Sequence, residues 1–162
     1  MAISKFFGRP DNFAVSISHQ TGNGLTRTAE CSIWLNGKQL GDAGQSIFVE
    51  GFVRGLQGLA NALPHVDNMP RKPRNPQDFL SMIEGGEIFN SGRHLFLAIA
   101  GFDDFLKLFF RSNQTTSFFW SLHPDCLNMP QYLDTYGHEV FAAELQNSEI
   151  ERVVSEVLTS GS

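Results

Sequence analysis

The sequence has few of the residues that mark specialised classes of protein. Only 2 of its 162 residues are cysteine, too few for a disulfide framework. No apolar run approaches the roughly 20 residues that span a membrane, and residues 1–7 contain no apolar stretch of signal-peptide length. Lysine and arginine number 12 against 17 aspartates and glutamates, so the net charge is −5. These features argue against a disulfide scaffold, a membrane protein and a direct nucleic-acid binder, and they predict a cytoplasmic location.

Phenylalanine is the abundant residue, with 15 copies against 2 tyrosines. A phenyl ring buries a large apolar area and has no polar group to satisfy, so most of these rings are expected in a core. The hydrophobic fraction of 41% and the charged fraction of 18% are ordinary for a folded protein. Because the chain shows no internal repeat and no low-complexity tract, residues 1–162 are predicted to form a single domain.

Alternating apolar residues predict strands in the first part of the chain. One strand is predicted at 13–17, and turn residues follow it at 21–24. A second strand, at 29–35, runs into Asn36-Gly37, a pair that tolerates the two positive φ angles of a tight hairpin turn. Residues 38–40 are then predicted to return as a short strand.

Apolar residues recur every three or four positions from about Ser46 to Pro64, which predicts a helix. Three glycines inside this stretch predict a close approach of the helix backbone to the sheet. The apolar positions are Phe48, Phe52, Leu56, Leu59 and Leu63, and the glycines are Gly51, Gly55 and Gly58.

A proline-rich segment at 65–76 carries three basic residues. Such a segment can be a nucleic-acid-binding arm or a solvated loop, and we favour the loop because the basic residues are few. A short helix is predicted next, with Asn75 as its cap, Pro76 at its first position and Gly85-Gly86 at its end.

The second half is rich in strand patterns. Alternation predicts strands at 95–99 and 139–145, and a hairpin of 105–111 with 116–122. Trp120 is expected to be buried, because its strand is apolar on both faces.

A closing helix is predicted from a capping box formed by Ser148 and Glu151. One face of this helix is apolar, with Ile150, Val153, Val154, Val157 and Leu158. Strands joined by tight turns pair antiparallel, and the helices come in separate blocks. The sequence therefore predicts an α+β fold: a mostly antiparallel sheet of about five to seven strands with two or three helices packed on it.

Catalytic patterns are missing from the sequence. The five histidines are dispersed, and His123-Pro-Asp-Cys126 offers two metal ligands where a structural zinc site needs about four. Cys31 falls on the apolar face of a strand, where an inert thiol is expected. No nucleophile elbow and no dinucleotide fingerprint occurs. We therefore predict no catalytic residue, no metal ligand and no cofactor-binding residue, and interpret the protein as a non-enzyme.

The second strand and its turn resemble a known family. Residues 32–42 have the sequence SIWLNGKQLGD, which is similar to a stretch in small immunity proteins of bacterial polymorphic-toxin and contact-dependent growth inhibition systems. Residues 116–122, TSFFWSL, and the strand and helix at 139–158 are similar to that family in order and spacing. The resemblance implies an α+β immunity protein that binds a cognate toxin domain in the cytoplasm and blocks it.

The net charge of −5 fits a basic toxin partner, such as a nuclease, because complementary charge speeds association. Glu84, Glu87, Asp103 and Asp104 are the candidate partner-binding residues, since they lie in turn-like segments beside apolar strands. Two alternatives stay open at this point. The first is an adaptor or chaperone for a secreted effector, and the second is an enzyme whose site is not visible in sequence.

Overall fold

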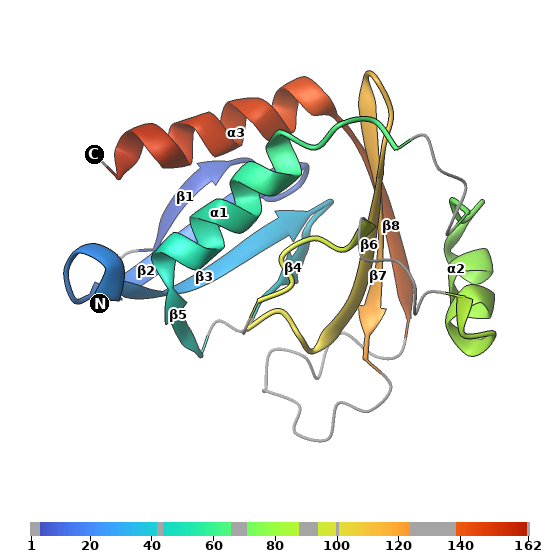
Figure 1. Ribbon diagram of the computed structural model, residues 1–162, viewed down its shortest axis with the longest axis horizontal. Helices are drawn as coiled ribbons and strands as arrows, with labels where there is room; N and C mark the ends of the chain where they lie inside the picture. Colours follow the sequence, from blue (N-terminus) through green and yellow to red (C-terminus); the bar gives the residue numbers. More distant parts are fainter. Residues whose placement is uncertain are drawn as a thin grey trace.

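Two antiparallel sheets and three α-helices form the described part of the chain (Figure 1). The structure is a computed structural model that describes residues 4–41, 44–65, 71–87, 94–99, 101–123 and 139–161. Its elements are β1 (Lys5–Gly8), β2 (Phe13–Thr21), a short 3₁₀ helix (Gly24–Thr26), β3 (Thr28–Leu35), β4 (Lys38–Leu40), β5 (Ser46–Phe48), α1 (Val49–Ala60), α2 (Pro76–Glu84), β6 (Phe105–Arg111), β7 (Thr115–Leu122), β8 (Val140–Gln146) and α3 (Asn147–Ser160).

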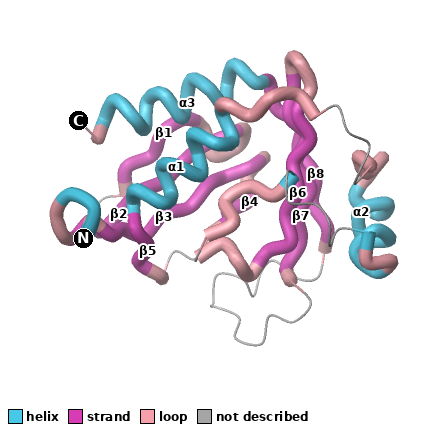
Figure 2. The backbone as a smooth tube through the Cα atoms, in the orientation of Figure 1, coloured by secondary structure: helices cyan, strands magenta, loops and turns pink. Residues whose placement is uncertain are grey.

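This architecture confirms the α+β class. The first sheet has the strand order β1-β2-β3-β4, with β5 also paired to β3, and the second has the order β6-β7-β8. Helices α1 and α3 pack on the first sheet, whereas α2 packs on the second (Figure 2). The division into two sheets is a long-range feature that alternation within single strands does not reveal.

The Asn36-Gly37 turn has the predicted hairpin geometry. Its two residues have φ angles of +51° and +82°, both in the left-handed region that such a turn needs. Leu35 pairs with Lys38 across it, so two residues connect β3 to β4. Ile33 and Leu35 are fully buried, which confirms the predicted inward face of the strand.

Helix α1 is shorter than predicted, because residues 46–48 form β5 beside β3. Phe48 is 63% exposed, and Leu63, which follows the helix, is 82% exposed. Both ends of the predicted helix are therefore wrong. Residues 28–30 of β3 lie at an edge that β4 does not cover. Residues 46–48 pair with this edge, which satisfies backbone hydrogen bonds before the helix begins. The middle of the apolar face is buried as predicted, with Phe52, Leu56 and Leu59.

Only one of the three helix glycines makes a close approach among the described residues. A Cβ atom on Gly55 would lie 2.8 Å from Cδ2 of Leu97, whereas one on Gly51 or Gly58 would meet nothing within 4 Å. The prediction that all three bring the backbone near the sheet is therefore wrong. Gly55 instead makes room for a side chain from a connecting segment.

Helix α2 begins and ends as predicted. The Oδ1 atom of Asn75 accepts a hydrogen bond from the backbone N–H of Asp78 at 2.8 Å, which caps the first turn. Pro76 occupies the start of the helix, where a missing N–H costs little. The helix stops at Glu84, directly before Gly85.

The second sheet contains the predicted hairpin and the predicted last strand. Arg111 pairs with Thr116 and Phe109 with Phe118, and β8 pairs with β7 along its length. The sheet is apolar on both faces because both are covered. Phe118, Trp120 and Leu122 face the larger core, and Leu108, Phe110 and Phe119 face α2.

Residues 95–99 do not form the predicted strand. Leu95 makes a single bridge to Leu108, and Leu97 has a φ angle of +47°, which interrupts an extended backbone. Phe96 and Leu97 are nevertheless buried. Burial of an irregular connection explains the apolar pattern, and periodicity alone does not separate the two cases.

The predicted capping box of α3 is wrong. The helix begins at Asn147, so Ser148 lies inside its first turn, and Gln146 at the cap makes no side-chain capping bond. The Asn147 side chain accepts a hydrogen bond from the Thr116 hydroxyl at 2.7 Å. Glu151 pairs with Arg111 instead of the helix start. Strand β8 leads straight into α3, which leaves no separate capping segment.

One large core joins the two sheets. Its buried side chains come from β2, β3, α1 and α3, and from the inner face of β6 and β7. A smaller cluster lies between α2 and the outer face of the second sheet. Trp120 is 1% exposed within the larger core, as predicted. Among the described helices, none is long and apolar enough to cross a membrane.

Candidate functional site

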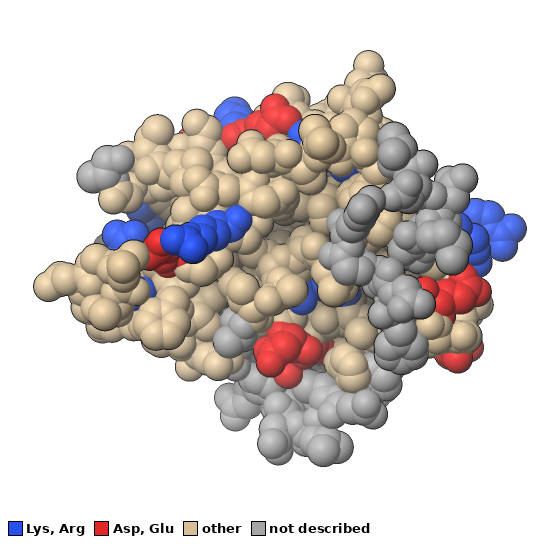
Figure 3. All heavy atoms as spheres, viewed as in Figure 1, with Lys and Arg blue, Asp and Glu red and all other residues tan. Residues whose placement is uncertain are grey.

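The four predicted partner-binding acids lie at two separate places. Glu84 and Glu87 are exposed at the C-terminal end of α2, and Asp103 and Asp104 lie in the turn before β6. Figure 1 shows α2 at the edge of the molecule, away from the start of β6. Acidic side chains form separate groups on the face seen in Figure 3. The fold therefore does not join these four carboxylates into one patch.

The basic residues of the proline-rich segment pair with the chain's own acids. Arg71 donates two hydrogen bonds to the Asp78 carboxylate, at 2.6 and 2.9 Å, and Arg74 donates through its backbone N–H at 2.8 Å. These bonds, with that of Arg71 first, hold the pKa of Asp78 well below its usual range. Lys72 lies 3.9 Å from Glu144. The pairing ties the segment to α2 and β8, in keeping with the loop interpretation.

Lys107 is a buried cation in β6. Its side chain is 5% exposed and shares the core-facing side of the strand with Phe105 and Phe109. Its ammonium group donates a hydrogen bond to the carbonyl oxygen of Phe102 at 2.8 Å. Burial lowers the pKa of Lys107 to about 8, and the charge of nearby Asp103 opposes part of that shift.

Replacing Lys107 with methionine is expected to raise the free energy of unfolding by about 1–2 kcal/mol near pH 7. Removing the buried charge stabilises the folded protein by about 3 kcal/mol, and losing the hydrogen bond to Phe102 destabilises it by about 1–2 kcal/mol. The pKa of Lys107 is about 8 in the folded protein, against about 10.4 in the unfolded chain. The unfolded state therefore binds more protons than the folded state in that interval. The free energy of unfolding of the wild-type protein should increase as the pH rises through it.

Urea denaturation of both proteins between about pH 7 and pH 10 measures this difference. The advantage of the methionine variant should shrink as the pH rises. An advantage that is absent near pH 7, or constant across the range, contradicts the burial of a charged Lys107.

His65, His94 and the buried Cys31 have packing and hydrogen-bonding roles within the fold. The rings of His65 and His94 stack with centroids 4.1 Å apart, and Nδ1 of His65 accepts a hydrogen bond from the backbone N–H of Arg111. Burial raises the pKa of Cys31 to about 12, which keeps its thiol protonated and unreactive. Cys126, which the sequence offered with His123 as a possible metal ligand, lies outside the described residues. Within the described ranges, no three potential metal ligands come together.

The first sheet has a second face, opposite α1 and α3, that presents aromatic side chains. The rings of Phe6 and Trp34 lie 6.2 Å apart, beside a hydroxyl pair formed by Ser16 and Ser32. A shallow pocket of about 150 Å³ lies among them. The indole N–H of Trp34 is buried without a hydrogen-bond partner in the described structure. Aromatic residues are enriched at protein interfaces, so this face is a candidate binding surface.

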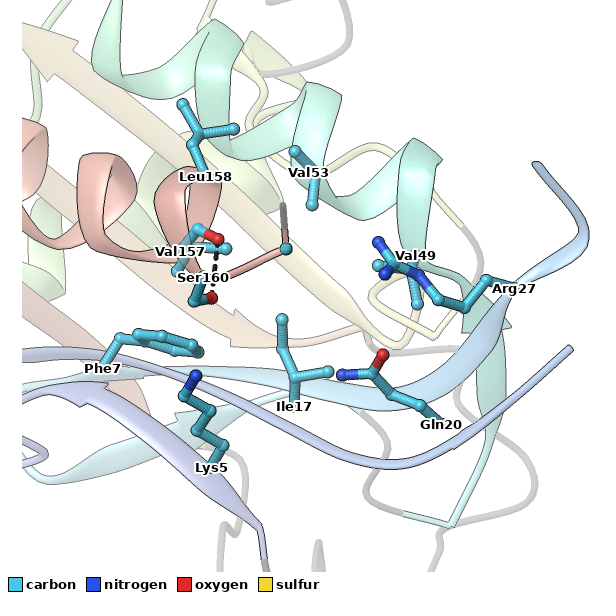
Figure 4. Close-up of a pocket in the computed structure, with 11 residues that line it drawn as sticks. Lys5, Phe7, Ile17, Gln20, Arg27, Val49, Val53, Val157, Leu158 and Ser160 are labelled. Atoms are coloured by element: carbon cyan, nitrogen blue, oxygen red, sulfur yellow. Dashed lines mark hydrogen bonds between the residues drawn. The ribbon is translucent and has the colours of Figure 1, made fainter. Parts of the chain in front are cut away.

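A pocket of about 200 Å³ opens between β1, β2 and the helices α1 and α3 (Figure 4). Two cationic side chains, Lys5 and Arg27, line it together with the amide of Gln20. None of its described lining residues is acidic, and the rest of the lining is mainly aliphatic. It is therefore a basic pocket with apolar walls.

Sequence reasoning missed three of these residues: Lys5, Arg27 and Lys107. For Lys107 a signal existed, because its strand is apolar on both faces and any residue within it is expected to be buried. Lys5 and Arg27 had no local signal. They line one pocket only because β1 pairs with β2, β2 pairs with β3, and α3 packs over the sheet.

These elements define a class of fold. A five-stranded antiparallel sheet carries two helices on one face, and a three-stranded antiparallel sheet completes the core and carries a third helix. A solved protein with this fold is known. The chain is similar to the crystal structure of CdiI from Burkholderia dolosa AUO158, with a TM-score of 0.59 and 14% sequence identity.

The similarity covers 96% of this chain and 99% of that one. CdiI is a contact-dependent growth inhibition immunity protein. The resemblance stated from sequence is therefore confirmed at the level of the fold. No protein-family model matches the sequence, and no curated protein matches it.

Proposed function

We propose that this protein is an immunity protein, which neutralises a bacterial toxin domain by stoichiometric, non-covalent binding. The supporting observation is the fold shared with CdiI over nearly the whole of both chains. On this proposal the protein is a single immunity domain that acts in the cytoplasm and has no catalytic site. The larger core, which joins both sheets, supports the single domain.

The charge of the chain supports a basic toxin, such as a nuclease. A net charge of −5 attracts a basic partner and speeds the encounter with it. The proposed partner is a protein domain, with no direct contact to nucleic acid or membrane. A fast encounter suits an inhibitor that must reach its toxin before the toxin reaches its substrate.

The test is protection of living cells. Cells that express a toxin domain encoded beside this gene should survive when they also express this protein, and should die with an empty vector. The two proteins should also purify together in a fixed ratio. Death in both cases contradicts the proposal. A stable complex in which the neighbour stays toxic identifies an adaptor instead.

The binding surface is proposed to include the acidic groups at one or both of the two places described above. Reversing Asp103 and Asp104 to lysine, or Glu84 and Glu87 to lysine, changes the net charge by the same amount. Each pair is therefore the matched control of the other.

Reversing the charges of the pair that faces the toxin should slow association by about three- to tenfold at low salt. The reason is that peripheral charges act mainly on the association rate. The effect should shrink at high salt, where such charges are screened. Surface plasmon resonance at two salt concentrations measures it. Unchanged association by both double variants removes all four residues from the interface and leaves the immunity proposal standing.

A further inference from the structure

The basic pocket beside the end of α3 has features of a binding site for a small anion. Figure 4 shows Lys5, Gln20 and Arg27 around a space whose other walls are mainly aliphatic or aromatic. Its volume of about 200 Å³ lies below the roughly 300–1,000 Å³ of pockets for drug-sized ligands. An occupant of this pocket is therefore a small group. The apolar walls are Phe7, Ile17, Val49, Val53, Val157 and Leu158.

Arg27 differs from the other arginines of the described structure. Each of those forms an ion pair with a carboxylate of the chain, as Arg9 does with Asp11 and Arg54 does with Glu50. Arg27 has no such partner in the described ranges, and its Nε–H is buried without an acceptor. Buried donors without an acceptor are rare and costly in folded proteins. The Arg27 guanidinium therefore lines the pocket without a carboxylate partner among the described residues, and it is available to an anion that enters the pocket.

The charge balance of the pocket favours an anion. The C-terminal end of α3 reaches the pocket through Ser160 and Gly161, and a helix end of this kind carries about half a negative charge. Lys5 and Arg27 bring two full positive charges. Neutralising the helix end accounts for only about a quarter of that charge. Among the described lining residues, an excess of about one and a half positive charges is left.

We propose that this pocket binds a carboxylate on a short aliphatic group, with the guanidinium of Arg27 as its principal partner. A planar guanidinium matches the two oxygens of a carboxylate, and the valines around it suit an aliphatic body. Lys5 adds a second cation from β1. Two sources share this chemistry: a free short-chain carboxylic acid, and the C-terminal carboxylate of a polypeptide that ends in an aliphatic residue. The inference goes beyond toxin neutralisation and does not rest on it.

Nuclear magnetic resonance tests the proposal on the wild-type protein, by following the Nε–H signals of its arginines. The probes are isovalerate and an acetylated tetrapeptide that ends in leucine, each compared with its uncharged amide. The acids should shift the Arg27 signal saturably, with a dissociation constant of about 1 mM or lower. The amides should not shift it. Tighter binding of the peptide identifies a polypeptide terminus as the source, and binding of isovalerate alone identifies a free acid.

Two arginine variants separate this pocket from general charge effects. Binding to the variants is followed through backbone amide signals, because replacing Arg27 removes its own side-chain signal. Arg27→Gln should weaken binding of the acid by at least about tenfold, because the charge-assisted bonds are lost. Arg54→Gln removes the same charge from an exposed site on α1 and should leave binding unchanged. Arg27→Lys keeps the charge, serves to assign the Arg27 signal, and should bind with intermediate strength. An absence of saturable shifts, equal shifts by the amides, or equal weakening by Arg54→Gln overturns the proposal.

Discussion

Replacing Trp120 with alanine is expected to lower the free energy of unfolding by about 3–5 kcal/mol, the usual loss for a large buried aromatic side chain. Trp120 is 1% exposed and lies on β7, the middle strand of the second sheet. Its indole stacks on Phe141 of β8 with ring centroids 5.7 Å apart. Paired strands on both sides of β7 hinder collapse around the missing ring, so the cavity should remain.

Trp34→Ala is the matched control for this loss. Trp34 is partly exposed on the open face of the first sheet, so its removal should cost less than about 2 kcal/mol. Urea denaturation followed by circular dichroism suits both variants, because each loses a fluorophore. A loss below about 1 kcal/mol for Trp120→Ala, or one no larger than that of Trp34→Ala, contradicts its place in the core.

Replacing Gly8 with alanine is expected to cost about 2–5 kcal/mol. Gly8 has a φ angle of +82°, and a Cβ atom there would lie 2.3 Å from the carbonyl oxygen of Phe13 and 2.7 Å from Cγ2 of Val153. The left-handed backbone accounts for about 1–2 kcal/mol, and forcing β1 away from β2 and α3 adds about 1–3 kcal/mol.

Gly37→Ala isolates the backbone part of that cost. Gly37 has the same φ angle of +82°, but a Cβ atom there would meet nothing within 4 Å in the described structure. Its replacement should cost only about 1–2 kcal/mol, again measured by chemical denaturation. Equal losses of unfolding free energy in the two variants would show that a Cβ atom at Gly8 can be accommodated beside Val153 at no cost. That result would contradict the close packing of α3 on β1.

Local patterns were sufficient where the decisive interactions are themselves local. The Asn36-Gly37 turn depends on two residues that tolerate positive φ angles, and the start of α2 depends on Asn75 and Pro76. Prediction was wrong where a distant partner decides the conformation. Residues 46–48 became a strand because β3 offers an edge, and Glu151 turned to Arg111 instead of capping its helix.

The candidate site shows the same division. The sequence predicted Glu84, Glu87, Asp103 and Asp104 in exposed, turn-like segments. The structure makes Glu84 the last residue of α2, leaves Asp104 only partly exposed, and sets the four at two separate places. No pattern in the sequence marked the pocket of Lys5 and Arg27, because its two cations come from segments that meet only when the first sheet pairs.

The sequence by itself determined the α+β class, the hairpins and the aromatic core, since alternation, turn residues and phenylalanine content act over a few neighbouring positions. It also contained the resemblance to immunity proteins that the fold then bore out. Only the tertiary structure decided that the strands divide into two sheets and that Arg27 has no partner among the described residues. Those outcomes depend on which segments, far apart in the sequence, pack together and exclude water. No local stretch of the chain encodes such long-range packing.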